Sequence, residues 1–134
     1  MSNDSNHEIP DSIDLSNAIV TSPDGLGRSE RNALSMLCEE VDKRTGIRFD
    51  RTHEWPQTER PVICVVPATQ LSSFAGTQAI EMPTDTGSDR PEGFRLVVQN
   101  HSEGTTVFVI GNDARGVLFG IGRLLREMRM NFQV

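Results

Sequence analysis

The sequence contains no tyrosine and a single tryptophan. Sugar-binding proteins usually expose several aromatic rings, because ring faces cover the apolar C–H faces of sugars. Trp55 precedes Pro56 in a predicted loop and is the candidate for a sugar or partner contact. One ring makes only a weak sugar site, so the isolated chain is not predicted to be a strong carbohydrate binder.

Cysteine occurs only twice, which is too few for a disulfide framework. Cys38 falls in a helical pattern and Cys64 in a strand pattern, both among apolar neighbours. This setting predicts two buried free thiols. A single disulfide and a reactive or metal-binding thiol are the alternatives.

Membrane and nucleic-acid functions are disfavoured by what the chain lacks. No apolar run approaches the roughly 20 residues that a membrane-spanning helix needs. The net charge of −6 disfavours nucleic-acid binding, which requires a basic face. The N-terminal segment lacks the basic start and apolar middle of a secretory signal, so no export signal is predicted and the compartment stays open.

Side chains that carry catalysis or bind metals are scattered along the chain. A zinc site needs about four clustered ligands, whereas the histidines lie far apart. They are His7, His53 and His101. Glu39, Glu40 and Asp42 are neighbours on the outer side of a predicted helix, where they face no cleft and form a solvated charge cluster. We therefore expect no catalytic residue, metal or cofactor in this chain.

The apolar pattern predicts one α+β domain over residues 17–134, after a mobile acidic tail over residues 1–16. A helix is predicted in the stretch 28–46, with Ser29 as its N-cap and Gly46 as its left-handed end. Strands are predicted near 17–22, 47–52, 61–67, 92–100 and 105–112, and a second helix starts at 112 or 113. The predicted order is β-α-β-β-β-β-α, a mixed β-sheet with two main helices packed on one face.

The second helix carries the glycines of the stretch "VFVIGNDARGVLFGIGRLL". Gly116, Gly120 and Gly122 have the spacing of the cofactor loop in short-chain dehydrogenases. A nucleotide loop should follow its strand directly, but this triplet begins five residues after Gly111 and lies inside an apolar helical pattern. The favoured interpretation is close helix–sheet packing at Gly116 and Gly120, at a cost of about 1 kcal/mol of helix stability for each glycine.

The start and faces of this helix follow from charge and spacing. Asp113 is predicted at the helix start, where the macrodipole favours a carboxylate. A broad apolar face is predicted at helical spacing, and it includes Leu118. Its members are Val117, Leu118, Ile121, Leu124, Leu125 and Met128. The sheet face opposite the helices is predicted to be polar or to contact a neighbouring domain.

The stretch "GNDARGVLFGIGRLL" resembles the end of the small domain that precedes the catalytic barrel in beta-N-acetylhexosaminidases (glycoside hydrolase family 20) and alpha-glucuronidases (family 67). Those domains tend to end with a strand, then G-x-D-x-R-G-x-x-[FY]-G, then a helix. The matching positions are Gly111, Asp113, Arg115, Gly116, Phe119, Gly120, Leu124 and Leu125. "PEGFRLVV" over 91–98 is similar to the family's entry to the penultimate strand, and the resemblance covers about residues 17–130.

The resemblance implies a non-catalytic accessory domain that packs against a following (β/α)8 barrel. In that family the barrel holds the catalytic acid and base, so those residues have no counterpart here. The implied partner is a neighbouring catalytic domain, and the parent protein is expected to be a glycoside hydrolase. One alternative is a stand-alone carbohydrate- or protein-binding module, with Trp55 and the predicted irregular segment 67–91 as its contact surface. The other is a fragment of a nucleotide-dependent enzyme, which the glycine spacing disfavours.

Overall fold

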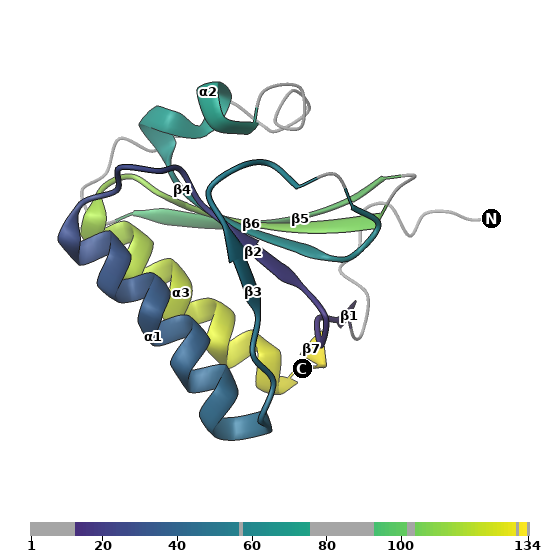
Figure 1. Ribbon diagram of the computed structural model, residues 1–134. Coiled ribbons are helices and arrows are strands. Elements are labelled where there is room, and N and C mark those ends of the chain that lie inside the picture. Colours follow the sequence, from purple (N-terminus) through teal and green to yellow (C-terminus); the bar gives the residue numbers. More distant parts are fainter. Residues whose placement is uncertain (1–12, 57, 76–92, 102–103, 131, 134) are drawn as a thin grey trace.

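The computed structural model describes residues 13–56, 58–75, 93–101, 104–130 and 132–133. Its centre is a five-stranded mixed sheet in the order β3-β2-β4-β6-β5 (Figure 1). The strands are β2 (Ile19–Thr21), β3 (Asp50–Thr52), β4 (Val62–Pro67), β5 (Phe94–His101) and β6 (Gly104–Gly111). Strands β3, β2, β4 and β6 run parallel, whereas β5 pairs antiparallel with β6.

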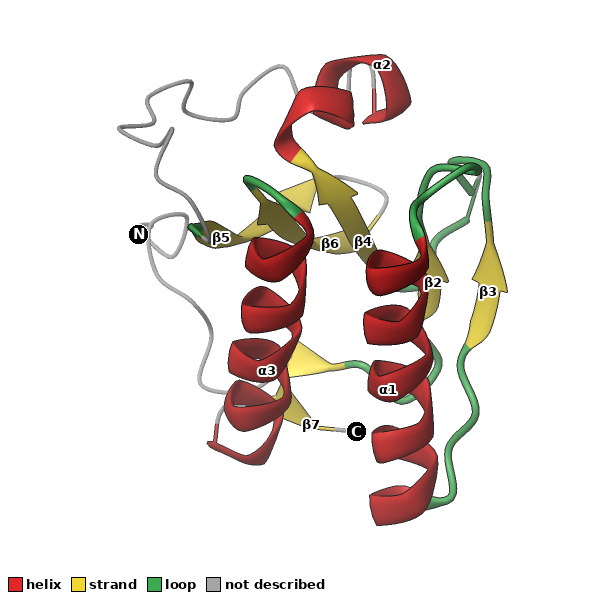
Figure 2. Ribbon diagram, turned by 90° about the vertical axis from the view of Figure 1, so that its left-hand side faces the viewer, coloured by secondary structure: helices red, strands yellow, loops and turns green. Residues whose placement is uncertain are grey.

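Two long helices, α1 (Arg28–Thr45) and α3 (Ala114–Met130), lie side by side on one face of this sheet (Figure 2). The main elements follow in the order β2-α1-β3-β4-β5-β6-α3. The predicted α+β class, the element order and the placement of both helices on one face are therefore confirmed. Within the described residues, no helix is long and apolar enough to cross a membrane.

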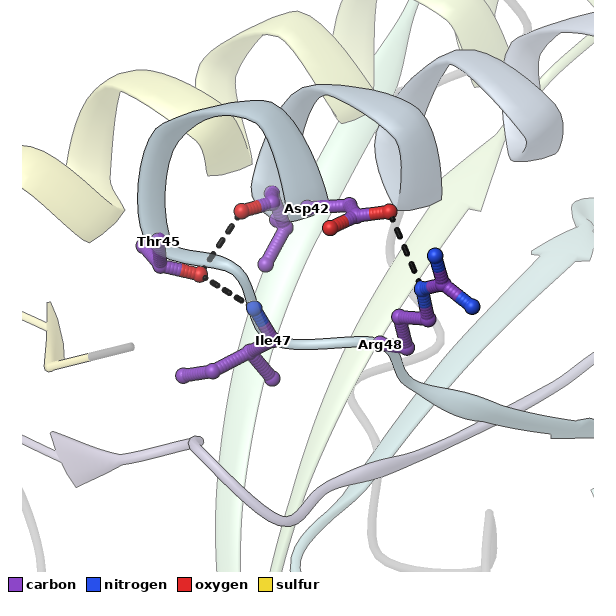
Figure 3. Close-up of polar contacts among 5 residues, drawn as sticks. Asp42, Thr45, Ile47 and Arg48 are labelled. Atoms are coloured by element: carbon purple, nitrogen blue, oxygen red, sulfur yellow. Dashed lines mark hydrogen bonds and ion pairs between the residues drawn. The ribbon is translucent and has the colours of Figure 1, made fainter.

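The ends of α1 are closed by local hydrogen bonds. The helix begins after Gly27, whose backbone N–H donates to Glu30 Oε1 at 2.8 Å. The predicted N-cap Ser29 is wrong, because it lies inside the first turn. At the other end Gly46 is left-handed at φ 78°, as predicted, and its N–H donates to the carbonyl of Asp42. The Thr45 hydroxyl then accepts the N–H of Ile47 at 3.0 Å and holds the chain as it leaves the helix (Figure 3).

Alternating residues of β4 and β6 bury both faces of the central sheet. Ile63, Val65, Val107 and Val109 face α1 and α3 in the main core. Cys64, Val66, Phe108 and Ile110 point the other way and are also almost completely buried. The continuous apolar run over 62–66 is the pattern expected of a parallel strand covered on both sides.

The predicted tail over 1–16 overlaps the folded domain. Residues 1–12 lie outside the described part, but β1 (Ile13–Asp14) pairs in parallel with β7 (Phe132–Gln133). Leu15 is fully buried in the main core. The domain boundary at residue 17 is therefore corrected to include residues 13–16.

The irregular segment predicted over 67–91 is helical at its start. A 3₁₀ turn, η2 (Ala68–Gln70), leads into the short helix α2 (Leu71–Ala75). Figure 1 shows α2 on the side of the sheet away from α1 and α3. Residues 76–92, including Pro91 and Glu92 of the family-like stretch, lie outside the described residues, as do residues 102–103.

Candidate functional site

Three aromatic rings meet on the sheet face opposite α1 and α3, and we call them the aromatic cluster: Trp55, Phe74 and Phe108. The Trp55 and Phe108 rings stack with centroids 5.9 Å apart and an interplanar angle of 22°. Phe74 of α2 meets Trp55 edge-on, with centroids 6.1 Å apart. Both arrangements are favourable for aromatic pairs. The cluster therefore joins β6, α2 and the loop after β3.

The loop that carries Trp55 is held by contacts to the end of β2. The Thr21 hydroxyl donates to the carbonyl oxygen of Glu54 at 2.8 Å. The Nδ1 atom of His53 lies 3.3 Å from the carbonyl oxygen of Ser22. These contacts position the indole next to Phe108, which lies two strands away from β2.

Trp55 is half-buried, so the residue keeps some exposure to solvent. One ring face lies on Phe108, which leaves at most the other face for a ligand. The sheet face that was predicted to be polar or to meet another domain is instead covered in part from within the chain. Trp55, Leu71 and Phe74 pack against its buried residues, next to Val97 of β5 in the sheet itself. The three-residue spacing of Leu71 and Phe74, typical of one helix side, was the available signal for this cover.

The predicted carboxylate cluster on α1 forms ion pairs along the helix surface. Glu40 lies 3.3 Å from Arg44 and 3.7 Å from Lys43. Asp42 Oδ2 lies 3.3 Å from Arg48 Nε just beyond the helix end (Figure 3). Exposed pairs of this kind contribute little to stability. Over the described part of the chain, no three His, Cys, Asp or Glu side chains gather where they could hold a metal ion.

Both cysteines are free thiols on opposite sides of the sheet. Cys38 of α1 packs half-buried against the main core, and Cys64 is fully buried beside the aromatic cluster. Burial raises the pKa of both thiols above its ordinary value. At Cys38 the Arg51 guanidinium lowers the pKa and the Glu39 carboxylate raises it, but burial dominates. A raised pKa keeps a thiol protonated and poorly nucleophilic.

The buried Cys64 thiol makes the fold less stable in alkali. Above a pH of about 8.5 the unfolded thiol ionises while the folded thiol stays protonated, so the unfolded state binds fewer protons. We expect the free energy of unfolding to fall by up to about 1.4 kcal/mol per pH unit for this group. Urea unfolding at pH 8, 9 and 10 measures the effect, and Cys64→Ala should show a shallower decline. Equal declines in the two proteins would contradict this account.

The glycines singled out in α3 lie inside the helix. The connection between β6 and α3 is only Asn112 and Asp113, so it is not a glycine-rich loop. Asp113 precedes the helix, and its Oδ1 accepts the N–H of Gly116 at 2.8 Å. A nucleotide phosphate would need free N–H groups at this end, and the carboxylate already occupies one of them.

Gly116 and Gly120 lie where α3 meets the sheet. A Cβ at Gly116 would overlap the carbonyl oxygen of Gly93, just before β5. A Cβ at Gly120 would lie 2.7 Å from Val109 Cγ1. At Gly122 nothing beyond its chain neighbours and the adjacent helix backbone lies within 4 Å of an added Cβ. Gly122 therefore has no packing role within the described fold.

The apolar face predicted for α3 is wrong at Leu118. Val117, Ile121, Leu124, Leu125 and Met128 are buried, but Leu118 is 40% exposed. The next residue, Phe119, is 44% exposed. Leu118 lies at the margin of the buried stripe, because each helical residue turns by about 100° from the one before. The apolar spacing assigned Leu118 to the buried face, so the sequence pattern did not indicate these two residues as an exposed pair.

A region of a GH138 enzyme targeting pectin rhamnogalacturonan II has a similar fold, with a TM-score of 0.53 and 14% sequence identity. The match covers 84% of this chain and 13% of that chain, so the shared fold is a small part of a much longer protein. No protein-family model matches the sequence, and neither does any curated protein. At this identity the likeness establishes a shared fold and assigns no activity.

Proposed function

We propose that this chain is a non-catalytic accessory domain of a carbohydrate-active glycoside hydrolase, which packs against and supports a following (β/α)8 barrel. The observation that carries the proposal is the shared fold with a small region of a glycoside hydrolase. The resemblance of residues 111–125 to the pre-barrel domain of beta-N-acetylhexosaminidases and alpha-glucuronidases narrows the proposed type. The substrate class proposed for the parent protein is a glycoside.

The roles of the motif residues support an accessory function. Asp113 caps α3, and Gly116 and Gly120 allow the helix to pack closely against the sheet. Gly111 is equally constrained, because a Cβ there would overlap the backbone nitrogen of Val117. Each of these residues shapes the β6–α3 junction. A motif that serves packing in this way belongs with a supporting domain.

The test compares two polypeptides on aryl glycosides. One is the 134-residue chain, and the other is the product of the complete reading frame that encodes it. We expect the complete product to release 4-nitrophenol from a 4-nitrophenyl N-acetyl-β-glucosaminide or a 4-nitrophenyl glucuronide, and the chain alone to release none. Turnover by the chain alone, lost on substitution of a single carboxylate, would refute the accessory function.

The second candidate is a stand-alone carbohydrate- or protein-binding module. The half-buried state of Trp55 favours it, because the residue keeps some exposure to solvent. Trp55 is the only tryptophan, so its fluorescence reports directly on ligand contact. Titration with chitin or pectin oligosaccharides to millimolar concentration would change the emission of the wild type. Unchanged Trp55 emission throughout the titration would rule out the carbohydrate-binding function.

A further inference from the structure

The sheet face opposite α1 and α3 is covered in two parts. Its four buried residues, which we call the second core, form two rows across β4 and β6: Cys64 beside Phe108, and Val66 beside Ile110. Trp55 stacks on Phe108, so the loop after β3 covers the first row. The second row lies at the end of β4, where the chain continues into η2 and α2. The cover of this row therefore comes from α2, which lies on this side of the sheet (Figure 1).

The short helix α2 is attached to the rest of the domain by apolar contacts. Leu71 and Phe74 are half-buried against the second core, and Phe74 meets Trp55 edge-on. The Ser73 hydroxyl donates to the carbonyl oxygen of Gln70 at 3.2 Å, so this hydrogen bond stays inside the segment. Among the described side chains of η2 and α2, none forms a hydrogen bond or an ion pair with a strand of the sheet.

The loop that carries Trp55 is attached more firmly. The carbonyl oxygen of Glu54 accepts a hydrogen bond from the hydroxyl of Thr21, which is fully buried on β2. Moving this loop away would leave a buried hydroxyl without its partner, which costs more free energy than separating apolar groups of the same size. The contact between Trp55 and Phe74 is therefore the boundary between a firmly held part and a weakly held part of the cover.

The length of α2 adds to this difference. It has five residues, and a helix of that length is not stable in water by itself, so α2 stays helical only while it packs on the sheet. Its two anchors, Leu71 and Phe74, are only half-buried, so little apolar area is exposed when α2 leaves. Segments with few buried apolar contacts open locally at free energies well below that of global unfolding.

We propose that α2 is a reversible cover that opens while the rest of the domain stays folded. Opening exposes the second row, Val66 and Ile110, and the edge of Trp55 that Phe74 contacts. The first row stays covered, because Trp55 keeps its place in the sheet-bound loop. The position of α2 thus controls how much of this sheet face is accessible from solution. The proposal concerns this chain alone, so it does not depend on the proposed function.

Thiol labelling of the 134-residue chain tests the opening. Val66→Cys is introduced together with Cys38→Ala, and the native Cys64 is kept as an internal control in the first row. Labelling by a maleimide is followed by tandem mass spectrometry, which resolves positions 64 and 66. Because thiol reactivity depends on access, we expect position 66 to label at least about tenfold faster than Cys64. Equal rates at the two positions would overturn the proposal.

Low concentrations of urea distinguish local opening from global unfolding. The dependence of an opening reaction on urea scales with the surface that it exposes, and α2 exposes little. Below the unfolding midpoint, labelling at position 66 should therefore change by less than about twofold, while labelling of Cys64 rises steeply. If Cys64 labels independently of urea at the rate of position 66, Trp55 leaves together with α2 and the proposed boundary is wrong.

Two substitutions in this background separate the cover from the main core. Phe74→Ala should raise labelling at position 66 about tenfold, because it removes about half the burial free energy of a full ring. Ile121→Val, at a fully buried site on α3, is the control. It should raise labelling of Cys64 about fivefold and leave position 66 unchanged, because it weakens the closed and open forms equally. Acceleration of both positions alike by Ile121→Val would contradict a local opening.

Hydrogen exchange of the unmodified chain keeps the test independent of the substitutions. The amides of α2 should exchange at rates that do not depend on low urea, whereas the central amides of β4 and β6 should exchange only through global unfolding. Protection of α2 equal to that of β4, with the same dependence on urea, would show that the cover and the sheet open together and would refute the proposal.

Discussion

Phe108→Ala is expected to lower the free energy of unfolding by about 3–5 kcal/mol, which is the range for removing a buried phenylalanine ring. Phe108 is fully buried on β6, an inner strand of the sheet between β4 and β5. Its ring supports Trp55 by stacking and lies beside Cys64 on the neighbouring strand. A domain is typically stable by only about 5–15 kcal/mol, so this one change removes a large part of the total.

Two measurements follow the loss of Phe108. Urea unfolding monitored by circular dichroism gives the change in free energy. Trp55 fluorescence in the folded state should move to longer wavelength, because the indole loses its stacking partner and gains contact with water. Phe119→Ala is the matched control, since the same substitution at an exposed site should change stability by no more than about 0.5 kcal/mol. Similar losses for the two variants would contradict the assignment of Phe108 to the core.

Gly116→Ala and Gly122→Ala are expected to have opposite effects in the same helix. At Gly116 the new methyl group would meet the backbone carbonyl of Gly93, which also accepts the N–H of Asn112 at 2.9 Å. Overpacking lowers the free energy of unfolding by about 1–3 kcal/mol. Because the obstacle at Gly116 is backbone, which moves less easily than a side chain, we expect a loss at or above the upper end of this range. At Gly122 the space is open, so alanine should stabilise the helix by about 0.5–1 kcal/mol.

The comparison of these two variants isolates packing from helix propensity. Both replace glycine with alanine inside α3, so the propensity gain is shared and the difference reports the contact with Gly93. Thermal and urea unfolding of the two variants and the wild type measure it. A stabilised Gly116→Ala variant would show that the helix does not approach the sheet as closely as described.

Elements with strong local patterns were predictable from the sequence. The spacing of Leu34, Leu37 and Val41 places the core side of α1, and the apolar run in β4 indicates a strand buried on both sides. Gly46 predicted the left-handed turn that ends α1, because glycine adopts this conformation readily. These features depend on neighbours within a few residues, so the chain itself encodes them locally.

Features that join distant segments were not predictable in the same way. The pairing of β1 with β7 links the two ends of the described chain, and each strand has only two residues. Trp55 was found as a loop residue after a strand, but its partner Phe108 lies on a strand formed much later in the chain. Leu118 is apolar like a core residue, but its position around the helix axis leaves its side chain exposed. Tertiary geometry decides each of these cases.

The pairing of β1 with β7 also determines how the domain would sit in a longer polypeptide. Because the two strands are adjacent and each has only two residues, the described chain begins and ends at the same corner of the domain. Segments attached before β1 and after β7 would therefore be held close to each other. In such a protein the domain would protrude from the side of the polypeptide, and it would not separate the domains before and after it.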